Sequence, residues 1–263
     1  MNYKLTIGWL YPDLMSTYGD RGNVIVLQKR CEARNIQVDI LPITQDTNDQ
    51  RLNTVDILFG GGSQDREQEI VMRDLKGKKQ EILKKLVEND IPALFVCGAP
   101  QLMGKFYEPS RGKRIEGLGI FNMETINPGP KTPRCIGNII AEVDWSHLYP
   151  THNSSLITHN LLIVGFENHG GRTYLGKNAK PFAKVIKGYG NNGKDGTEGV
   201  VYKNAIGCYF HGPLLPKNPQ IADFLIQRAL EVKYKKEIIL KNLDDTLELK
   251  AREAIVKRLK VHI

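Results

Sequence analysis

The chain has 263 residues, of which 41% are hydrophobic and 25% are charged, and its formal net charge is +8 at pH 7. This composition is typical of a globular protein, and no run approaches the roughly 18 apolar residues that a membrane-spanning helix needs. The basic residues are scattered without interleaved aromatic side chains, so we interpret them as a solvated surface and expect no nucleic-acid binding.

The N-terminal residues "MNYKLTIGWL" lack the basic region and long apolar stretch of a secretory signal. The chain contains four cysteines with no CxxC spacing: Cys31, Cys97, Cys135 and Cys208. A loop-rich stretch carries three histidines whose spacing fits no zinc signature: His147, His152 and His159. We therefore expect a cytoplasmic protein with reduced thiols and no bound metal.

Strand-like and helix-like segments alternate over the first hundred residues. Strands are expected where β-forming residues gather, over residues 4–11, 36–43, 54–62 and 91–96. Helices are expected at helical apolar spacing, over residues 23–35 and 65–89 and again from residue 99. This alternation predicts an α/β fold with a doubly wound, mainly parallel sheet flanked by helices.

The second half of the chain has a different pattern. From about residue 111 to 210 the segments are short and broken by Gly, Pro and Asn, which predicts antiparallel hairpins added to the same sheet. Helices are expected over residues 219–232 and about 245–260. We expect one domain over residues 1–232 and a basic helical extension over 233–263. The sequence leaves three docking sites open for this extension: its own domain, a partner subunit and a membrane surface.

The clearest chemical signal is Cys97, which ends the buried strand at 91–96 and precedes Gly98. In open α/β sheets, ligands bind at the carboxyl ends of the strands. A sharp turn into a helix would present the thiol there, and the N–H of Gly98 would help to form an oxyanion hole. The helix start also favours a thiolate. The alternative is a structural cysteine, and Ala99 stands where the usual elbow has a second glycine.

Two further segments favour nucleophilic chemistry. In "LFGGGSQDREQ" (58–68), the N–H groups of Gly61 and Gly62 are candidates for an oxyanion contact, although the glycines alone would also fit a plain turn. His211 follows an apolar run and is a candidate base for the thiol, although a lone histidine at a strand end is more often structural. The three features together predict a cysteine nucleophile with a histidine base.

Several blocks of the sequence resemble one enzyme family. In chain order they are "YPDLMSTYGDRGN" (11–23), "FGGGSQDREQ" (59–68), "KRIEGLGIFNMET" (113–125), "GFENHGGRTYLG" (165–176) and "YFHGPLLPKNP" (209–219). They resemble class I glutamine amidotransferases of the cobyric-acid-synthase-like branch. The closest likeness is to the GatD family, the glutaminase subunits of lipid II isoglutaminyl synthase, over roughly residues 4–230.

The resemblance implies a role for each candidate residue. Cys97 would attack the side-chain amide of glutamine and form a thioester, while His211 would carry the proton. Oxyanion contacts would come from the backbone N–H of Gly98 and from one N–H of the loop at Gly61 and Gly62. Two residues match positions that the family places near the bound glutamine: Gln101 and Arg134.

The resemblance also implies a partner. Ammonia would pass to a MurT-like subunit of the Mur ligase family, which uses ATP to amidate the D-glutamate of lipid II during peptidoglycan synthesis. The chain has no G-x-x-x-x-G-K-[ST] loop, which fits ATP chemistry in another subunit, and no cofactor is expected. Membrane proximity would be peripheral at most. The alternatives are a stand-alone γ-glutamyl cysteine hydrolase and a non-catalytic scaffold subunit.

Two departures from the wider class concern the site. "CGAPQ" replaces the more usual Cys-Gly-Gly, and Pro213 stands where most class I enzymes have the glutamate that orients the histidine. The orienting group is then either another carboxylate of this chain or one from the partner. We interpret Glu167 as a loop anchor. Asp20 and Arg21 form either a structural pair or a partner-facing pair.

Overall fold

The computed structural model describes residues 2–143, 145 and 161–261. A six-stranded sheet forms the centre, with strand order β13-β14-β4-β3-β1-β2. Its strands are β1 (Lys4–Leu10), β2 (Gln37–Ile43), β3 (Ile57–Gly60), β4 (Ala93–Val96), β13 (Val200–Tyr202) and β14 (Ala205–Cys208). All neighbours pair in parallel except the edge strand β13. The prediction of a mainly parallel α/β sheet is confirmed.

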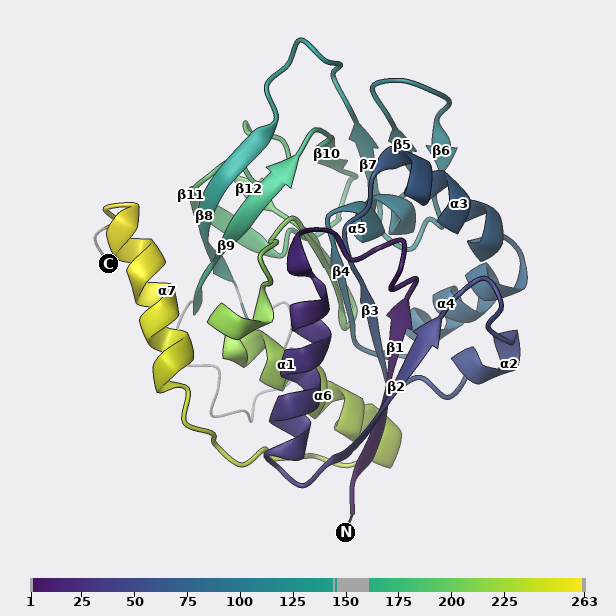
Figure 1. Ribbon diagram of the computed structural model, residues 1–263, viewed down its shortest axis with the longest axis vertical. Coiled ribbons are helices and arrows are strands. Elements are labelled where there is room, and N and C mark those ends of the chain that lie inside the picture. Colours follow the sequence, from purple (N-terminus) through teal and green to yellow (C-terminus); the bar gives the residue numbers. More distant parts are fainter. Residues whose placement is uncertain (1, 144, 146–160, 262–263) are drawn as a thin grey trace.

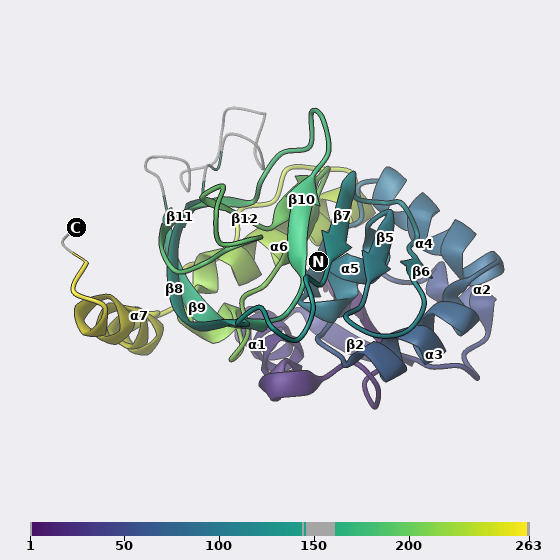
Figure 2. The same ribbon diagram turned by 90° about the horizontal axis from the view of Figure 1, so that it is seen from above.

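Helices cover both faces of this sheet (Figures 1 and 2). One face carries α1 (Arg21–Glu32) and α6 (Pro219–Tyr234). The other carries α3 (Asp65–Leu75), α4 (Lys78–Glu88) and α5 (Gly98–Met103). Short helical elements in the described connections include η1 (Thr17–Gly19), α2 (Asp49–Leu52) and η3 (Leu215–Lys217).

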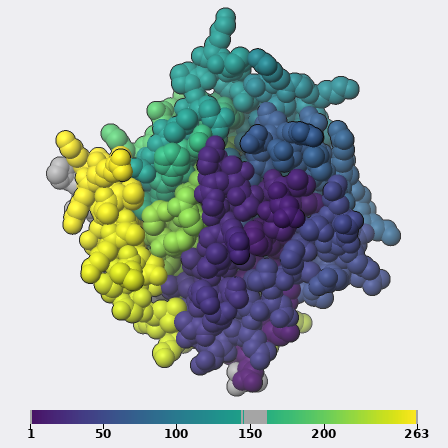
Figure 3. All heavy atoms as spheres, in the orientation of Figure 1, coloured from purple at the N-terminus to yellow at the C-terminus, as the bar shows by residue number. Residues whose placement is uncertain are grey.

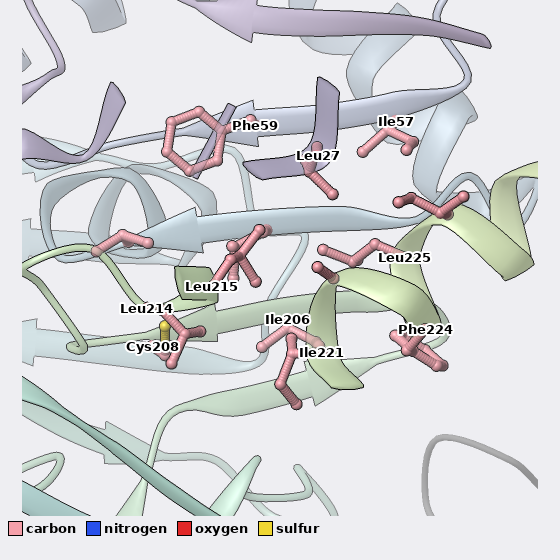
Figure 4. Packing of buried hydrophobic residues seen from close by; sticks show 14 of the residues in the cluster. Leu27, Ile57, Phe59, Ile206, Cys208, Leu214, Leu215, Ile221, Phe224 and Leu225 are labelled. Carbon is pink, nitrogen blue, oxygen red and sulfur yellow. The ribbon is translucent and has the colours of Figure 1, made fainter. Parts of the chain in front are cut away.

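The core under α1 and α6 is apolar and closely packed. Figure 4 shows Leu27 of α1 and Leu225 of α6 facing Ile57 and Phe59 of β3. These side chains are fully buried. Strands buried by helices on both faces read as continuous apolar runs, which is the reason that the sequence revealed them.

The second half differs from the expectation in one respect, because only β13 and β14 join the central sheet. One additional sheet has the order β10-β7-β5-β6, from β5 (Phe106–Glu108), β6 (Ile115–Glu116), β7 (Met123–Ile126) and β10 (Arg172–Leu175). The other has the order β12-β11-β8-β9, from β8 (Cys135–Val143), β9 (Leu161–His169), β11 (Ala183–Lys187) and β12 (Thr197–Glu198). Figure 1 shows both beyond the carboxyl ends of the central strands.

The single helix expected over residues 65–89 is two helices. The break lies at Gly77, whose φ of +92° is a backbone conformation that other residues rarely adopt. Lys76 before it is extended. Apolar spacing does not reveal this break, because both helices keep their apolar faces toward the same sheet.

The C-terminal extension docks on its own domain. Helix α7 (Thr246–Arg258) packs Val256 against Ile140 and Val164, and Arg252 Nη1 donates to the Leu162 carbonyl at 2.6 Å. Figure 3 shows this helix in yellow along one flank of the molecule. The domain boundary placed at residue 232 falls inside the last turn of α6. None of the helices that the structure describes is both long and apolar enough to cross a membrane.

Candidate active site

Cys97 occupies the strained turn that the sequence predicted. It lies between β4 and α5 with φ 55° and ψ −94°, a conformation that costs a non-glycine residue about 1–3 kcal/mol. The Cys97 N–H donates to the Cys208 carbonyl at 2.8 Å and ties the turn to β14. A Cβ on Gly98 would lie 2.6 Å from Ser63 Oγ, so the residue after the cysteine has to be glycine. The turn presents the Cys97 side chain to a cleft.

His211 lines the same cleft and is fully buried. Its backbone pairs with Phe166 of β9: the His211 N–H donates to the Phe166 carbonyl at 2.7 Å, and the reverse bond measures 3.2 Å. A Cβ on Gly62 would lie 2.7 Å from His211 Cε1 and 3.5 Å from Cys97 Cβ. The imidazole and the thiol therefore meet beside Gly62, although they are far apart in the sequence.

Asp20 holds the other side of the imidazole. Its Oδ1 lies 3.1 Å from His211 Nδ1, and its Oδ2 accepts the Gly62 N–H at 2.7 Å. Both side chains are fully buried. Burial lowers the pKa of His211, but Cys97 and Asp20 outweigh it and raise the pKa to about 10. The raised pKa favours a protonated imidazole at neutral pH.

Asp20 is a candidate site residue to which the sequence assigned no catalytic role. It is buried, so it does not face a partner, and it forms no ion pair with Arg21 among the described residues. Its contact with His211 Nδ1 makes it the candidate, within this chain, for the orienting group that position 213 does not supply. The only signal was its position in the family block at 11–23, because 191 residues separate it from His211.

The glycine loop packs closely against the segment that carries Asp20. Because the Gly62 N–H is bound to Asp20, it is already engaged. A Cβ on Gly61 would lie 2.5 Å from the Met15 carbonyl oxygen, so this glycine permits close packing. Gly98 opens α5, where the first N–H groups have no partner within the helix. The oxyanion roles of Gly98 and Gly61 stay predictions, whereas the bond to Asp20 argues against the N–H of Gly62.

The cleft has a volume of about 430 Å³ and also contains both expected substrate-binding residues. Gln101 is held at both ends: Gln68 Nε2 donates to its Oε1 at 3.0 Å, and its Nε2 donates to Tyr209 Oη at 3.2 Å. Arg134 donates to the side-chain and main-chain oxygens of Asn168, at 3.0 Å each. A larger groove of about 560 Å³ elsewhere contains none of the site residues.

Buried polar side chains support the floor of the cleft. Tyr209 stacks on His169 with ring centres 3.8 Å apart, and its hydroxyl lies 2.6 Å from Thr173 Oγ1. Glu167 accepts the N–H groups of Tyr189 and Gly190 at 2.7 and 2.9 Å, which confirms its interpretation as a loop anchor.

The remaining cysteines lie outside the cleft. All four thiols are free and buried, and burial raises the pKa of Cys31, Cys135 and Cys208. Within the described ranges, no group of three acidic, histidine or cysteine side chains could hold a metal ion. The three histidines whose spacing was compared with zinc signatures lie outside the described residues: His147, His152 and His159.

Comparison with known proteins identifies the family. Residues 6–219 match the CobB/CobQ-like glutamine amidotransferase domain. The chain is 40% identical to subunit GatD of the glutamine-hydrolysing lipid II isoglutaminyl synthase from Streptococcus pneumoniae, over 95% of this chain and 90% of the relative. It belongs to the GatD family. The GatD subunit from Staphylococcus aureus is 38% identical, over 97% of this chain and 96% of the relative.

Membership of the GatD family makes this chain a glutamine amidotransferase subunit. The fold agrees with that assignment. The PurLQS structure from Thermotoga maritima superposes with a TM-score of 0.53 at 14% identity, covering 90% of this chain and all of the other. The family resemblance expected from the sequence blocks is confirmed.

Proposed function

We propose that this chain is the cytoplasmic glutaminase subunit of a two-subunit enzyme that amidates the D-glutamate of lipid II. The observation that carries the proposal is that Cys97 and His211 line one cleft, while Asp20 lies 3.1 Å from the Nδ1 atom of His211. The names of the GatD relatives supply the lipid substrate and the status of a subunit. The partner would be a MurT-like synthetase, because this chain has no nucleotide-binding loop of its own.

The geometry supports a two-step mechanism. The Cys97 thiolate attacks the side-chain amide carbon of glutamine, and the charge on the oxygen is stabilised by the Gly98 N–H. The His211 imidazolium protonates the departing nitrogen, so the C–N bond breaks, ammonia leaves and a γ-glutamyl thioester remains. His211, now neutral, then takes a proton from water. The resulting hydroxide attacks the thioester carbon, which releases glutamate and restores the thiolate–imidazolium pair.

Asp20 would keep the imidazole in the correct orientation through both steps. A carboxylate beside Nδ1 holds a proton on that nitrogen and leaves Nε2 for the thiol and the substrate. The carboxylate in the chain itself therefore supplies the third group, and the partner need not provide it. The ammonia would move to the synthetase, where ATP activates the acceptor carboxylate.

The experiment compares two nitrogen sources with the complex of this chain and its synthetase. Cys97→Ala should abolish amidation of lipid II with glutamine and leave amidation with ammonium chloride intact. Cys31→Ala, which removes another buried thiol, is the control and should retain both activities. Glutamine-dependent amidation by Cys97→Ala would instead indicate a scaffold. Rapid turnover of γ-glutamyl peptides by the chain alone would indicate a hydrolase.

A further inference from the structure

The cleft carries unpaired groups of opposite charge. The Arg134 guanidinium is held by Asn168 alone and pairs with no carboxylate among the described residues. Asp65, the first residue of α3, lines the same cleft. It is the only carboxylate among the described lining residues, and no described cation forms an ion pair with it. Arg66 also lines the cleft, so open groups of both charges face it, and such a cleft suits a zwitterionic ligand.

Asp65 is oriented without being neutralised. The Tyr107 hydroxyl donates to Asp65 Oδ1 at 2.8 Å, and Tyr107 is 3% exposed. Burial and the Asp65 charge both raise the pKa of Tyr107, so the phenol stays protonated and remains a neutral donor. One carboxylate oxygen is thus anchored, and the negative charge remains available to a ligand.

Two acceptors without partners lie close to Asp65 in the sequence and line the same cleft. Gln68 is 2% exposed, and while its Nε2 donates to Gln101, its Oε1 has no partner. Ser63 Oγ is buried and also has none. Both side chains approach Gly98, because a Cβ there would lie 2.6 Å from Ser63 Oγ and 3.0 Å from Gln68 Nε2. Buried polar atoms without partners are unusual, and a ligand that donates hydrogen bonds would satisfy them.

We propose that the segment Ser63–Gln68 is the subsite for the α-ammonium group of glutamine, with Asp65 supplying the charge. This inference rests on the proposed glutaminase function and adds a determinant of specificity to it. An α-ammonium group has three N–H donors, which match Asp65, Gln68 Oε1 and Ser63 Oγ. The subsite would select free glutamine over glutamine within a peptide, whose α-nitrogen is uncharged.

The test uses the full chain with Cys97→Ala, so that ligands bind without turnover, and calorimetry with three ligands. They are L-glutamine, glutaramate (glutamine without its ammonium group) and 4-aminobutanamide (glutamine without its carboxylate). Adding Asp65→Asn should weaken the binding of glutamine and of 4-aminobutanamide by about 10- to 100-fold, and the affinity for glutaramate should stay unchanged. Adding Arg134→Gln should weaken the binding of glutamine and of glutaramate, and the affinity for 4-aminobutanamide should stay unchanged.

The matched control is Glu69→Gln, which makes the same charge change on the same helix. Glu69 lies 3.6 Å from Arg73 and does not line the cleft, so all three affinities should hold. Unchanged glutamine affinity in Asp65→Asn would overturn the inference, as would an equal loss for glutaramate. Failure of the Cys97→Ala chain to bind glutamine at all would instead overturn the proposed function.

Discussion

Replacing Asp20 with asparagine tests the catalytic arrangement most directly. Both oxygens of Asp20 accept hydrogen bonds, one from the Gly62 N–H at 2.7 Å and one from His211 Nδ1 at 3.1 Å. Asparagine offers one oxygen and one NH₂ group, so one of these donors loses its acceptor. Either the loop loses its anchor, or His211 changes tautomer and places its proton on Nε2, where it can no longer accept one from the thiol.

The expected loss of kcat in Asp20→Asn follows from the role of the imidazole in proton transfer. Correctly placed general acid–base catalysis contributes about 10²- to 10⁴-fold, so kcat for glutamine hydrolysis should fall by about that factor while KM changes little. The substitution would leave the expected substrate contacts at Arg134 and Gln101 unaltered. The assay is glutamate release by the full chain together with its synthetase.

The dependence of kcat on pH distinguishes an effect of Asp20→Asn on His211 from a general loss of stability. Burial lowers the pKa of His211, whereas Cys97 and Asp20 raise it, to about 10 overall. The imidazolium is therefore present below that pKa, and activity is lost as pH rises through it. Removing the Asp20 charge should move this alkaline limb to lower pH.

The control is Asp56→Asn, another buried carboxylate, which accepts the Thr6 N–H and pairs with Lys233 at 2.7 Å. Asp56→Asn should lower the free energy of unfolding, and the pH at which activity is lost on the alkaline side should not change. If Asp20→Asn kept near wild-type kcat and an unchanged limb, the proposed orientation of His211 by this chain would be refuted.

Three further predictions concern other parts of the molecule. Gly62→Ala should lower kcat by at least about 10-fold with little effect on glutamine binding, because the new methyl would lie 2.7 Å from His211 Cε1; steady-state kinetics checks this. Arg252→Ala should reduce the free energy of unfolding by about 1–3 kcal/mol without changing kcat, as measured by urea titration, because α7 loses its bond to β9. Burial raises the pKa of Glu198 to about 8, so wild-type stability should fall as pH rises from about 4.5 to 8, and Glu198→Gln should remove this dependence in melting scans.

Local patterns were sufficient to predict the strands and the tight turn at Cys97. An apolar run that ends in Cys97 and Gly98 specifies a buried strand and a tight turn through neighbouring residues alone, and the structure contains both. The break at Gly77 was missed because a glycine between two polar segments is compatible with a continuous helix until its backbone is known to adopt a positive φ.

The role of the glycine loop shows the limit of motif reading. The loop was recognisable at Gly61 and Gly62, and its place beside the nucleophile was expected. Which N–H groups remain free depends on their acceptors, and the acceptor of the Gly62 N–H is Asp20, from a different segment. No spacing rule within the loop contains that information.

The sequence by itself determined the α/β class, the family and the residues whose chemistry depends on their immediate neighbours. Only the tertiary structure decided which distant residues complete the site: Asp20 behind His211, and Asp65 in the cleft with Arg134. The physical reason is that strand and turn propensities act over a few residues. The protonation and orientation of a buried imidazole, in contrast, depend on charges that the fold brings within about 3–4 Å from anywhere in the chain.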